Sequence, residues 1–202
     1  NFPLLQSEVA RSTQEALQIA KKIGTKLAMK IVSPDILHKS DVGGVMLNVT
    51  ADDIEEKYQE MMEIVGKNKP EAKLEGVLLM EMAPDNGTEV ILGVNQAPGL
   101  GTMIMFGLGG IYVEVLKDVS FAYAPLTKTD ALEMIHSLQT AELFEGVRGE
   151  KPRDVEKLVE CIGRLSQLVT DFPQIIELDI NPLLSLPEGQ GAKVLDVRVV
   201  IK

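Results

Sequence analysis

The stretch KLAMKIVSPDILHKSDVGGVMLNV, Lys26–Val49, contains the pattern that decides the fold of the N-terminal part of this chain. The apolar run Lys26–Val32 predicts a β-strand, and Val45–Val49 predicts a second strand. The segment between them, Ser33–Gly44, is polar and ends in two glycines. This segment is either an ordinary connecting turn or a loop built to contact phosphate.

A single lysine interrupts the first predicted strand. The apolar residues at alternate positions, Leu27, Met29 and Ile31, would share one face, which places Lys30 on the other face. A lysine in such a position is costly to bury unless an anion meets it, so Lys30 is a candidate for binding phosphate. The alternative is that its side chain reaches past the apolar surface into water.

The polar loop carries further groups that could contact phosphate. Gly43 and Gly44 would free the backbone to expose amides, and consecutive amides can surround phosphate oxygens. His38 adds a titratable ring, and Lys39 adds a fixed positive charge. The loop does not match the G-x-x-x-x-G-K-[ST] pattern of the P-loop. The loop residues alone leave both alternatives open.

Helices and strands are mixed along the rest of the chain. Ser12 and Glu15 form a capping-box pattern, which predicts a helix from Ser12 to Gly24. Asp85–Gly87 predicts a hairpin turn. The other predicted helices lie near residues 51–67, 130–139 and 153–171, and the other predicted strands near 76–82, 88–94, 101–107, 112–126, 175–180 and 193–201. We therefore expect an α+β fold with a small lobe, residues 1–75, and a larger lobe, residues 76–202.

A second group of polar residues lies near the C-terminus. Asp179 and Asn181, in ELDINP (Glu177–Pro182), alternate along a strand end, and Asp196 lies on the following predicted strand. If these strands pair, the carboxylate and amide oxygens could converge. Mg²⁺ prefers oxygen ligands and often needs only one or two protein carboxylates plus substrate phosphates. The alternative is a strand-end turn in which Asn181-Pro182 supplies the bend.

Three other segments carry weaker signals. Glu81 and Met82, in LLMEM, lie where a strand leaving the small lobe could offer backbone groups to an adenine edge, or where a carboxylate would simply face water. The G-x-G-G pattern at Gly107–Gly110 fits neither the dinucleotide fingerprint nor the kinase loop. His136 has no metal or nucleophile partner at helical spacing, so we expect it to be structural.

Composition narrows the classes of function. The net charge of −10 disfavours broad nucleic-acid binding, which usually needs a basic face. We find no signal peptide and no apolar run long enough to cross a membrane. The only cysteine, Cys161, excludes an internal disulfide and a cysteine-cluster zinc site and suits a reducing compartment such as the cytoplasm. The chain begins with Asn1 rather than Met, so we expect a fragment, a processed product or one domain of a longer polypeptide.

Several motifs together resemble the ATP-grasp region of NDP-forming acyl-CoA synthetases, and among these the beta subunit of ADP-forming acetyl-CoA synthetase. The resemblance runs from about Ser7 to the C-terminus and rests on the order and spacing of AMKIVSPDILHKSDVGGV, EMAPDNGTEVILGV, MFGLGGIYVEVLKDVSF, EGVRG and IIELDINPL. It implies the ATP-grasp fold, in which two α+β lobes form a nucleotide cleft between them.

The resemblance implies roles in binding ATP or ADP and Mg²⁺. Lys30 matches the ATP-phosphate lysine of the family, and Glu81 and Met82 match the adenine-side hinge between the lobes. Asn181 and Asp196 match the pair that holds Mg²⁺. With these assignments, the amides of Gly43 and Gly44 would support phosphate oxygens.

The resemblance also implies phosphoryl transfer and a partner. Asp179 matches an acidic position near the phosphohistidine, and His38 matches a histidine suggested to take part in a phosphoryl relay. The main phosphorylated histidine of the family lies on a CoA-binding alpha subunit or domain, so we expect a hetero-oligomer or a fused protein that is active only with that partner. The implied reaction is acyl-CoA + ADP + phosphate ⇌ acid + CoA + ATP.

The chain departs from the family at two places, and a second function stays open. APGLG (Ala97–Gly101) stands where the family commonly has DP-x-FG, and Ala122 stands where it often has arginine. A helical segment that usually precedes this point is also missing. A similar domain occurs fused to protein acetyltransferases, where it resembles a nucleotide-sensing regulatory module, and the sequence leaves this alternative open.

Overall fold

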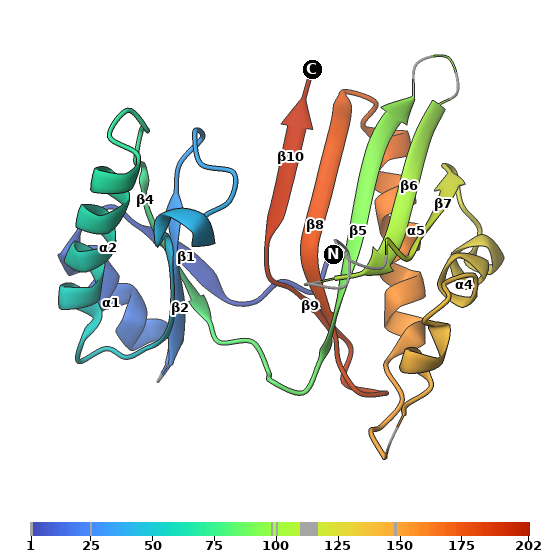
Figure 1. The fold of residues 1–202 in the computed structure, drawn as a ribbon, viewed down its shortest axis with the longest axis horizontal. Helices are drawn as coiled ribbons and strands as arrows, with labels where there is room; N and C mark the ends of the chain where they lie inside the picture. The colour runs from blue at the N-terminus through green and yellow to red at the C-terminus, as the bar shows by residue number, and fades with distance from the viewer. Residues whose placement is uncertain (1, 25, 98, 100, 110–116, 148) are drawn as a thin grey trace. The chain divides into compact units, whose positions relative to one another are not determined.

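The computed structural model describes the whole chain except residues 1, 25, 98, 100, 110–116 and 148, which Figure 1 draws as a thin grey trace. Two compact units are present, each with its own hydrophobic core. One unit is Leu5–Ala83, and the other combines the first residues, up to Leu4, with Pro84–Lys202. In the described part of the chain, no helix combines the length and the apolar character needed to span a membrane.

The N-terminal unit is a four-stranded antiparallel sheet with two helices packed on one face (Figure 1). The strand order is β1-β4-β2-β3. Apolar residues at alternate positions of β2, Leu27, Met29 and Ile31, are fully buried under the helices. The elements of this unit are β1 (Ser7–Ala10), α1 (Thr13–Ile23), β2 (Leu27–Val32), the short 3₁₀ helix η1 (Ser40–Val42), β3 (Val45–Val49), α2 (Ile54–Asn68) and β4 (Gly76–Glu81).

Helix α1 begins and ends where the sequence pattern predicts. The Ser12 hydroxyl accepts a hydrogen bond from the Glu15 amide at 3.2 Å. The Glu15 carboxylate accepts from the amide of Arg11 at 2.7 Å, one residue before the one that a standard capping box uses. The helix ends before Gly24, whose φ of 138° lies in the region that favours glycine.

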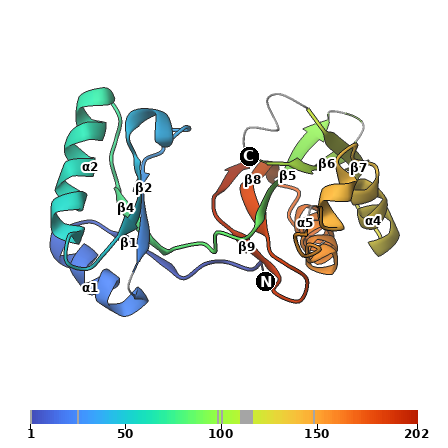
Figure 2. The ribbon, with the colours of Figure 1, turned by 60° about the horizontal axis from the view of Figure 1, so that its bottom comes forward.

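The C-terminal unit is an antiparallel sheet with α4 and α5 packed on one face (Figure 2). The strand order is β10-β8-β5-β6-β7, and β9 pairs with β8 at the side. The core lies between the sheet and these two helices. The elements are β5 (Thr88–Ala97), β6 (Gly101–Leu108), β7 (Val119–Tyr123), α4 (Lys128–His136), the 3₁₀ helix η2 (Ala141–Phe144), α5 (Val155–Asp171), β8 (Ile175–Ser185), β9 (Ala192–Val194) and β10 (Val197–Ile201).

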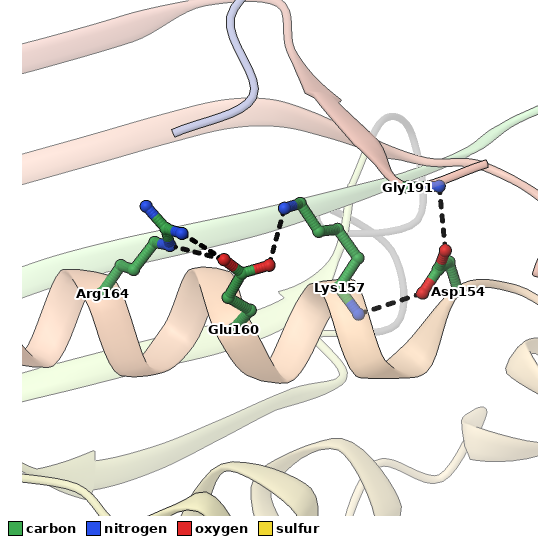
Figure 3. Close-up of polar contacts among 5 residues, drawn as sticks. All are labelled: Asp154, Lys157, Glu160, Arg164 and Gly191. Atoms are coloured by element: carbon green, nitrogen blue, oxygen red, sulfur yellow. Dashed lines mark hydrogen bonds and ion pairs between the residues drawn. The ribbon is translucent and has the colours of Figure 1, made fainter. Parts of the chain in front are cut away.

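Helix α5 is fixed at its start by Asp154 (Figure 3). The Asp154 carboxylate accepts from the amide of Lys157 at 3.0 Å and from the amide of Gly191, in the β8–β9 connection, at 2.9 Å. Farther along the helix, the half-buried Glu160 accepts from Lys157 Nζ at 2.6 Å and from Arg164 Nε at 2.8 Å. The cap therefore joins the helix to a distant turn as well as starting it.

The boundary between the units differs from the sequence-based expectation. We expected it between residues 75 and 76, whereas β4 forms hydrogen-bonded ladders with β1 and β2 and so belongs to the N-terminal unit. Asp85–Gly87 is therefore not the turn of a hairpin, because β4 and β5 lie in different sheets. The turn residues instead form part of the connection that enters the C-terminal unit.

The last strands also differ from expectation. Strand β8 continues through Asn181 and Pro182 to Ser185, so these residues are not a strand-end turn. The predicted strand 193–201 is divided into β9 and β10 at Leu195 and Asp196. Residues 112–116 of the predicted strand 112–126 lie outside the described residues, and β7 occupies Val119–Tyr123.

Candidate functional site

Lys30 lies on the central part of the small sheet. Strand β2 has β4 on one side and β3 on the other, and Lys30 is in register with Leu78 and Val45. Because Met29 and Ile31 point into the core under the helices, Lys30 points to the opposite face, where it is half-buried. The predicted orientation of this lysine is thus confirmed, while its role in binding phosphate stays a prediction.

The two glycines of the loop serve close packing. The Gly43 amide donates to the Ser40 carbonyl at 3.2 Å, and the Gly44 amide donates to the Lys39 carbonyl at 2.8 Å. A Cβ on Gly44 would lie 2.4 Å from Ile31 Cγ2. This geometry contradicts the prediction that these two amides are open to phosphate oxygens, because both donors are already used within the loop.

The loop presents His38 to solvent on an anchored backbone. Asn68 Nδ2, at the end of α2, donates to the Val42 carbonyl at 3.1 Å, and the Lys73 amide donates to the Asp35 carboxylate at 2.8 Å. The Gly44 carbonyl accepts from the Ile31 amide at 2.8 Å, so the loop returns to the sheet beside Lys30. The His38 side chain is exposed and accessible to a reacting group.

Glu81 and Met82 lie at the end of β4. The Glu81 amide donates to the Gln6 carbonyl at 2.9 Å, and the Met82 amide donates to the Lys26 carbonyl at 3.4 Å. An adenine edge at this position would therefore have to be met by carbonyl oxygens or by the exposed Glu81 carboxylate. The role of this pair as the adenine-side hinge stays a prediction.

The polar residues near the C-terminus lie close together along the backbone, with Asp179 and Asn181 on β8 and Asp196 just before β10. Strands β8 and β10 are antiparallel neighbours, and the Asn181 amide donates to the Asp196 carbonyl at 3.2 Å. Asp179 is directly opposite Arg198 in the same ladder. The backbone therefore brings Asp179, Asn181 and Asp196 to one end of the β8–β10 pair.

The electrostatic environment of these residues suits a cation. Burial raises the pKa of the Asp179 carboxyl, and the negative charges of Glu177 and Asp196 raise it further, against the opposing effect of Arg198. Arg198 itself donates to Glu177 at 2.8 Å. Glu177 is the member of this group that the sequence motifs did not single out, although its alternation with Asp179 along β8 points to it.

The donor set fits Mg²⁺ when the metal also has other ligands. Asn181 is exposed and Asp196 is half-buried, and their side chains would offer one amide oxygen and carboxylate oxygens as ligands. Among the described residues, no group of three or more histidine, cysteine or acidic side chains is arranged to hold a metal. An oxygen-ligated ion that keeps several waters and phosphate ligands matches this arrangement.

The candidate residues are divided between the two units. Lys30, His38, the glycine pair, Glu81 and Met82 belong to the unit Leu5–Ala83, and the acidic group belongs to the other unit. His136 is exposed in the last turn of α4, and the structural role expected for it stays a prediction. The loops at Ala97–Gly101 and Gly107–Gly110 include residues outside the described part of the chain.

Comparison with known sequences places these features in a family. The model of the ATP-grasp domain matches residues 1–201. The chain is 50% identical over 199 residues to 4-hydroxybutyrate–CoA ligase (ADP-forming) of Nitrosopumilus maritimus, which covers 98% of the chain but 28% of that protein. It is 43% identical over 203 residues to the beta subunit of acetate–CoA ligase II (ADP-forming) of Pyrococcus furiosus, which covers 100% of the chain and 86% of that subunit.

Solved structures agree with the sequence comparison. A dinucleotide-forming acetyl-coenzyme A synthetase 1 of Ca. Korarchaeum cryptofilum, in complex with coenzyme A and Ca-AMPCP, matches with a TM-score of 0.95 and 38% identity, over 100% of this chain and 87% of that one. Another complex of that enzyme, with coenzyme A and Mg-AMPPCP, matches with a TM-score of 0.85, 34% identity and coverage of 100% and 86%, and its phosphohistidine segment points towards the nucleotide binding site. The chain therefore belongs to the ATP-grasp domain family, in the group that includes the beta subunits of ADP-forming acetate–CoA ligases.

Proposed function

We propose that this chain is the nucleotide-binding part of an ADP-forming acid–CoA ligase, which transfers phosphate between ADP/ATP and a histidine relay. The observation that carries the proposal is that Asp179 and Asn181 on β8 lie close to Asp196, just before the neighbouring β10, in a chain that covers 86% of a beta subunit of such a ligase. The relatives named above are ligases or synthetases, which favours this function over a sensor domain of an acetyltransferase.

Each residue has a distinct part in this proposal. Lys30 offsets negative charge on the phosphates, and Asn181 and Asp196 hold Mg²⁺. Mg²⁺ held there would supply positive charge against the charge that develops on the transferred phosphoryl group. The protein contributes mainly position and electrostatics, because phosphoryl transfer needs little covalent chemistry from the enzyme.

The phosphoryl step uses a histidine as the nucleophile. A neutral imidazole nitrogen attacks the γ-phosphorus of ATP, the bond to the bridging oxygen breaks, and the electron pair leaves with ADP. The acceptor is a histidine of a CoA-binding partner chain or domain, and His38 of this chain is an exposed candidate for a second acceptor. Asp179, a half-buried carboxylate on β8, would hold and orient the imidazolium of the relay.

The complete reaction requires the other half of the enzyme. The chain spans 28% of the fused Nitrosopumilus ligase and nearly all of the separate Pyrococcus beta subunit. We infer that CoA and the acid are bound by the partner, and that this chain supplies the reaction of ATP and ADP. Acyl-CoA, ADP and phosphate would then be converted reversibly to acid, CoA and ATP.

Labelling with γ-³²P-ATP and Mg²⁺ tests this function, with and without the cognate partner. We expect acid-labile, base-stable phosphate, as for phosphohistidine, on the partner. Lys30→Met should weaken binding of Mg-ATP at least about tenfold, the cost of removing one charged hydrogen-bond donor. Lys26→Met, which changes an exposed lysine just before β2, is the matched control. If Mg-ATP neither binds nor raises the melting temperature, the proposal is wrong.

The two histidines of the chain allow a paired test of the relay. Any label on this chain should disappear in His38→Ala and persist in His136→Ala, since both side chains are exposed and only His38 lies in the loop beside Lys30. Label that survives in His38→Ala would exclude His38 as the acceptor. Binding of Mg-ATP without transfer to any histidine, with the partner present, would support a sensor instead.

A further inference from the structure

Arg198 lies directly opposite Asp179 on the neighbouring strand. Strands β8 and β10 are adjacent and antiparallel (Figure 1), and their register pairs Arg198 with Asp179 and Val199 with Leu178. Residues directly opposite in such a ladder point to the same side of the sheet. Because Leu178 is buried in the core under the helices, Asp179 and Arg198 point to the other face. The guanidinium therefore shares a face with the carboxylate that the proposed function places at the relay histidine.

Glu177 holds the Arg198 side chain in place. The guanidinium Nη1 donates to Glu177 Oε1 at 2.8 Å, and within the described part of the chain this is the one hydrogen bond that the guanidinium makes. Glu177 is one pleat from Asp179 on β8 and lies opposite Val200, so the bond runs diagonally across the ladder. A guanidinium carries five N–H donors in a planar fork. The remaining donors of Arg198 are thus available beside Asp179 while the side chain is anchored.

Arg198 is the only basic residue of this strand pair. Strands β8 and β10 are described throughout, and they hold the acids Glu177 and Asp179 against this one cation. The negative charges of Glu177 and Asp196 act on Asp179, and Arg198 opposes them. A phosphoryl group that approaches Asp179 would meet net negative charge unless a cation stands beside it. Arg198 is the cation that β8 and β10 offer at this point, since Lys30 belongs to the other unit.

We propose that Arg198 is a further catalytic residue, which donates N–H groups to the oxygens of the transferred phosphoryl group, and that Glu177 is the positioning residue that fixes its guanidinium. The proposal rests on the proposed function, because it requires the acceptor histidine to stand beside Asp179. The register of Arg198 with Asp179, together with its bond to Glu177, is the observation that carries it.

The two opposite side chains match the two halves of a phosphohistidine. Asp179 accepts from the N–H of the imidazole, and Arg198 donates to the phosphoryl oxygens. While the bond from the imidazole nitrogen to phosphorus forms and the bond to the bridging oxygen breaks, negative charge spreads over the three equatorial oxygens. A planar guanidinium can bind two such oxygens at once, and it stays protonated throughout. The same contact serves the reverse step, in which ADP takes the phosphoryl group.

The ion pair of Arg198 with Glu177 does not by itself explain the arginine. The two side chains are 52% and 45% exposed, and an ion pair at such a site contributes little to folding. A phosphate can therefore share or replace the glutamate at small cost, because charge-assisted bonds from arginine to phosphate are strong. A purely structural pair would make Arg198 matter for the melting temperature and leave the transfer of phosphate unchanged.

Single-turnover transfer of phosphate from γ-³²P-ATP and Mg²⁺ to the cognate partner, at saturating partner, tests the proposal. Arg198→Ala should lower the transfer rate about 100-fold or more, as when one donor to a developing oxyanion is removed. Binding of Mg-ATP should stay within about twofold, since the contact forms only during transfer. Arg164→Ala is the matched control and should leave both values unchanged, because Arg164 is also half-exposed and bonded to a glutamate, Glu160, but lies on α5.

Two further variants separate the contact from the positioning. Arg198→Lys keeps the charge but loses the planar fork, so its transfer rate should lie between those of the unchanged chain and Arg198→Ala. Glu177→Gln keeps the guanidinium but weakens its anchor, so the transfer rate should fall by less than in Arg198→Ala. A loss in Glu177→Gln equal to that in Arg198→Ala would contradict the assignment of the phosphate contact to Arg198.

Chemical rescue supplies a measurement that a structural role would not affect. Guanidinium chloride, well below its denaturing range, should raise the transfer rate of Arg198→Ala, whereas sodium chloride at the same concentration should not. The proposal is overturned if Arg198→Ala transfers phosphate at the unchanged rate, or if guanidinium restores none of the lost rate. Failure of the proposed function is distinguishable, because the unchanged chain would then transfer no phosphate to any histidine.

Discussion

Gly44 accepts no side chain larger than hydrogen. A Cβ there would lie 2.4 Å from Ile31 Cγ2 and 2.9 Å from the Lys39 carbonyl oxygen, and neither the strand nor the loop backbone can easily yield. Gly44→Ala should therefore lower the free energy of unfolding by about 1–3 kcal/mol, the usual cost of overpacking. Urea denaturation followed by circular dichroism measures this change.

Gly66→Ala is the matched control for that substitution. Gly66 lies inside α2, and a Cβ added there would meet no atom within 4 Å, so alanine should stabilise the helix by roughly 0.5–1 kcal/mol. A lower free energy of unfolding in Gly44→Ala, together with a higher one in Gly66→Ala, would support the packing role of Gly44. Equal changes in the free energy of unfolding would contradict the packing role of Gly44. Ligand binding would then be the remaining explanation for the loop glycines.

Asp179 predicts a dependence of stability on pH. Burial first, and then the charge of Glu177, raise the pKa of its carboxyl above the usual 3.8. The folded protein thus binds this proton more tightly than the unfolded chain, so the group's contribution to stability is fully present below pH 3.8 and is lost as the pH rises through the folded pKa. Asp179→Asn should therefore raise the free energy of unfolding at pH 7, and the gain should vanish towards pH 3.8.

Denaturation at a series of pH values between about 7 and 4 checks this sign. Asp85→Asn changes an exposed aspartate of the same unit and should leave stability nearly unchanged throughout. A loss of stability in Asp179→Asn at neutral pH would mean that the ionised carboxylate is stabilising in the fold, contrary to the direction of its pKa.

Individual residues were predictable only where a local pattern determines them. Alternation placed Lys30 opposite the apolar face of β2, and pairing of β8 with β10 brought Asn181 beside Asp196. The use of the Gly43 and Gly44 amides could not be predicted in this way, because it depends on how the loop folds back to Ser40 and Lys39. A glycine pair indicates freedom of the backbone, and only the tertiary structure shows what that freedom is used for.

At the level of elements, the cap of α5 has the clearest energetic consequence. Asp154 satisfies the Lys157 amide at the start of the helix and the Gly191 amide in a distant turn (Figure 3). Asp154→Ala should lower the free energy of unfolding by about 1–2 kcal/mol, the upper part of the range for helix caps, because two amides lose their acceptor. Thermal or urea denaturation measures the difference.

Glu156→Ala is the control for the cap. Its carboxylate lies in the same first turn, is 90% exposed and is 3.7 Å from Lys128 Nζ, so its removal should change stability by less than about 0.5 kcal/mol. If Asp154→Ala and Glu156→Ala lower the free energy of unfolding by the same amount, the two hydrogen bonds do not explain the effect of Asp154. The negative charge near the helix N-terminus would explain it instead.

Most elements were predictable because their patterns are local, and the errors share one cause. The helices at α1 and α5 follow capping residues and apolar spacing, which are independent of the rest of the fold. The turn Asp85–Gly87 has the composition of a hairpin, yet the strands on either side of it pair with partners elsewhere in sequence. Short turn signals do not specify strand partners, since pairing is decided by which apolar faces can be buried together.

For the molecule as a whole, the sequence indicated two α+β parts but placed the division too early. Strand β4 is apolar and precedes a polar connection, so its composition fits either part. Its ladders with β1 and β2 assign it to the N-terminal unit, and such long-range pairing is not encoded in any single segment. The candidate residues on either side of this division belong to separate cores, which has a consequence for ligand binding.

Mg-ATP should protect from unfolding each unit that supplies a ligand to it, so the proposed roles of Lys30 in one unit and of Asn181 and Asp196 in the other can be tested separately. At a free concentration of about 100 times Kd, a ligand that binds only the folded form adds about 2.7 kcal/mol, which slows exchange through unfolding about 100-fold. Native-state hydrogen exchange should therefore show slower exchange of core amides in both β2 and β8. Lys30→Met should weaken the protection in β2, whereas Lys26→Met should not, and a β2 that Mg-ATP leaves unprotected would contradict the proposed role of Lys30.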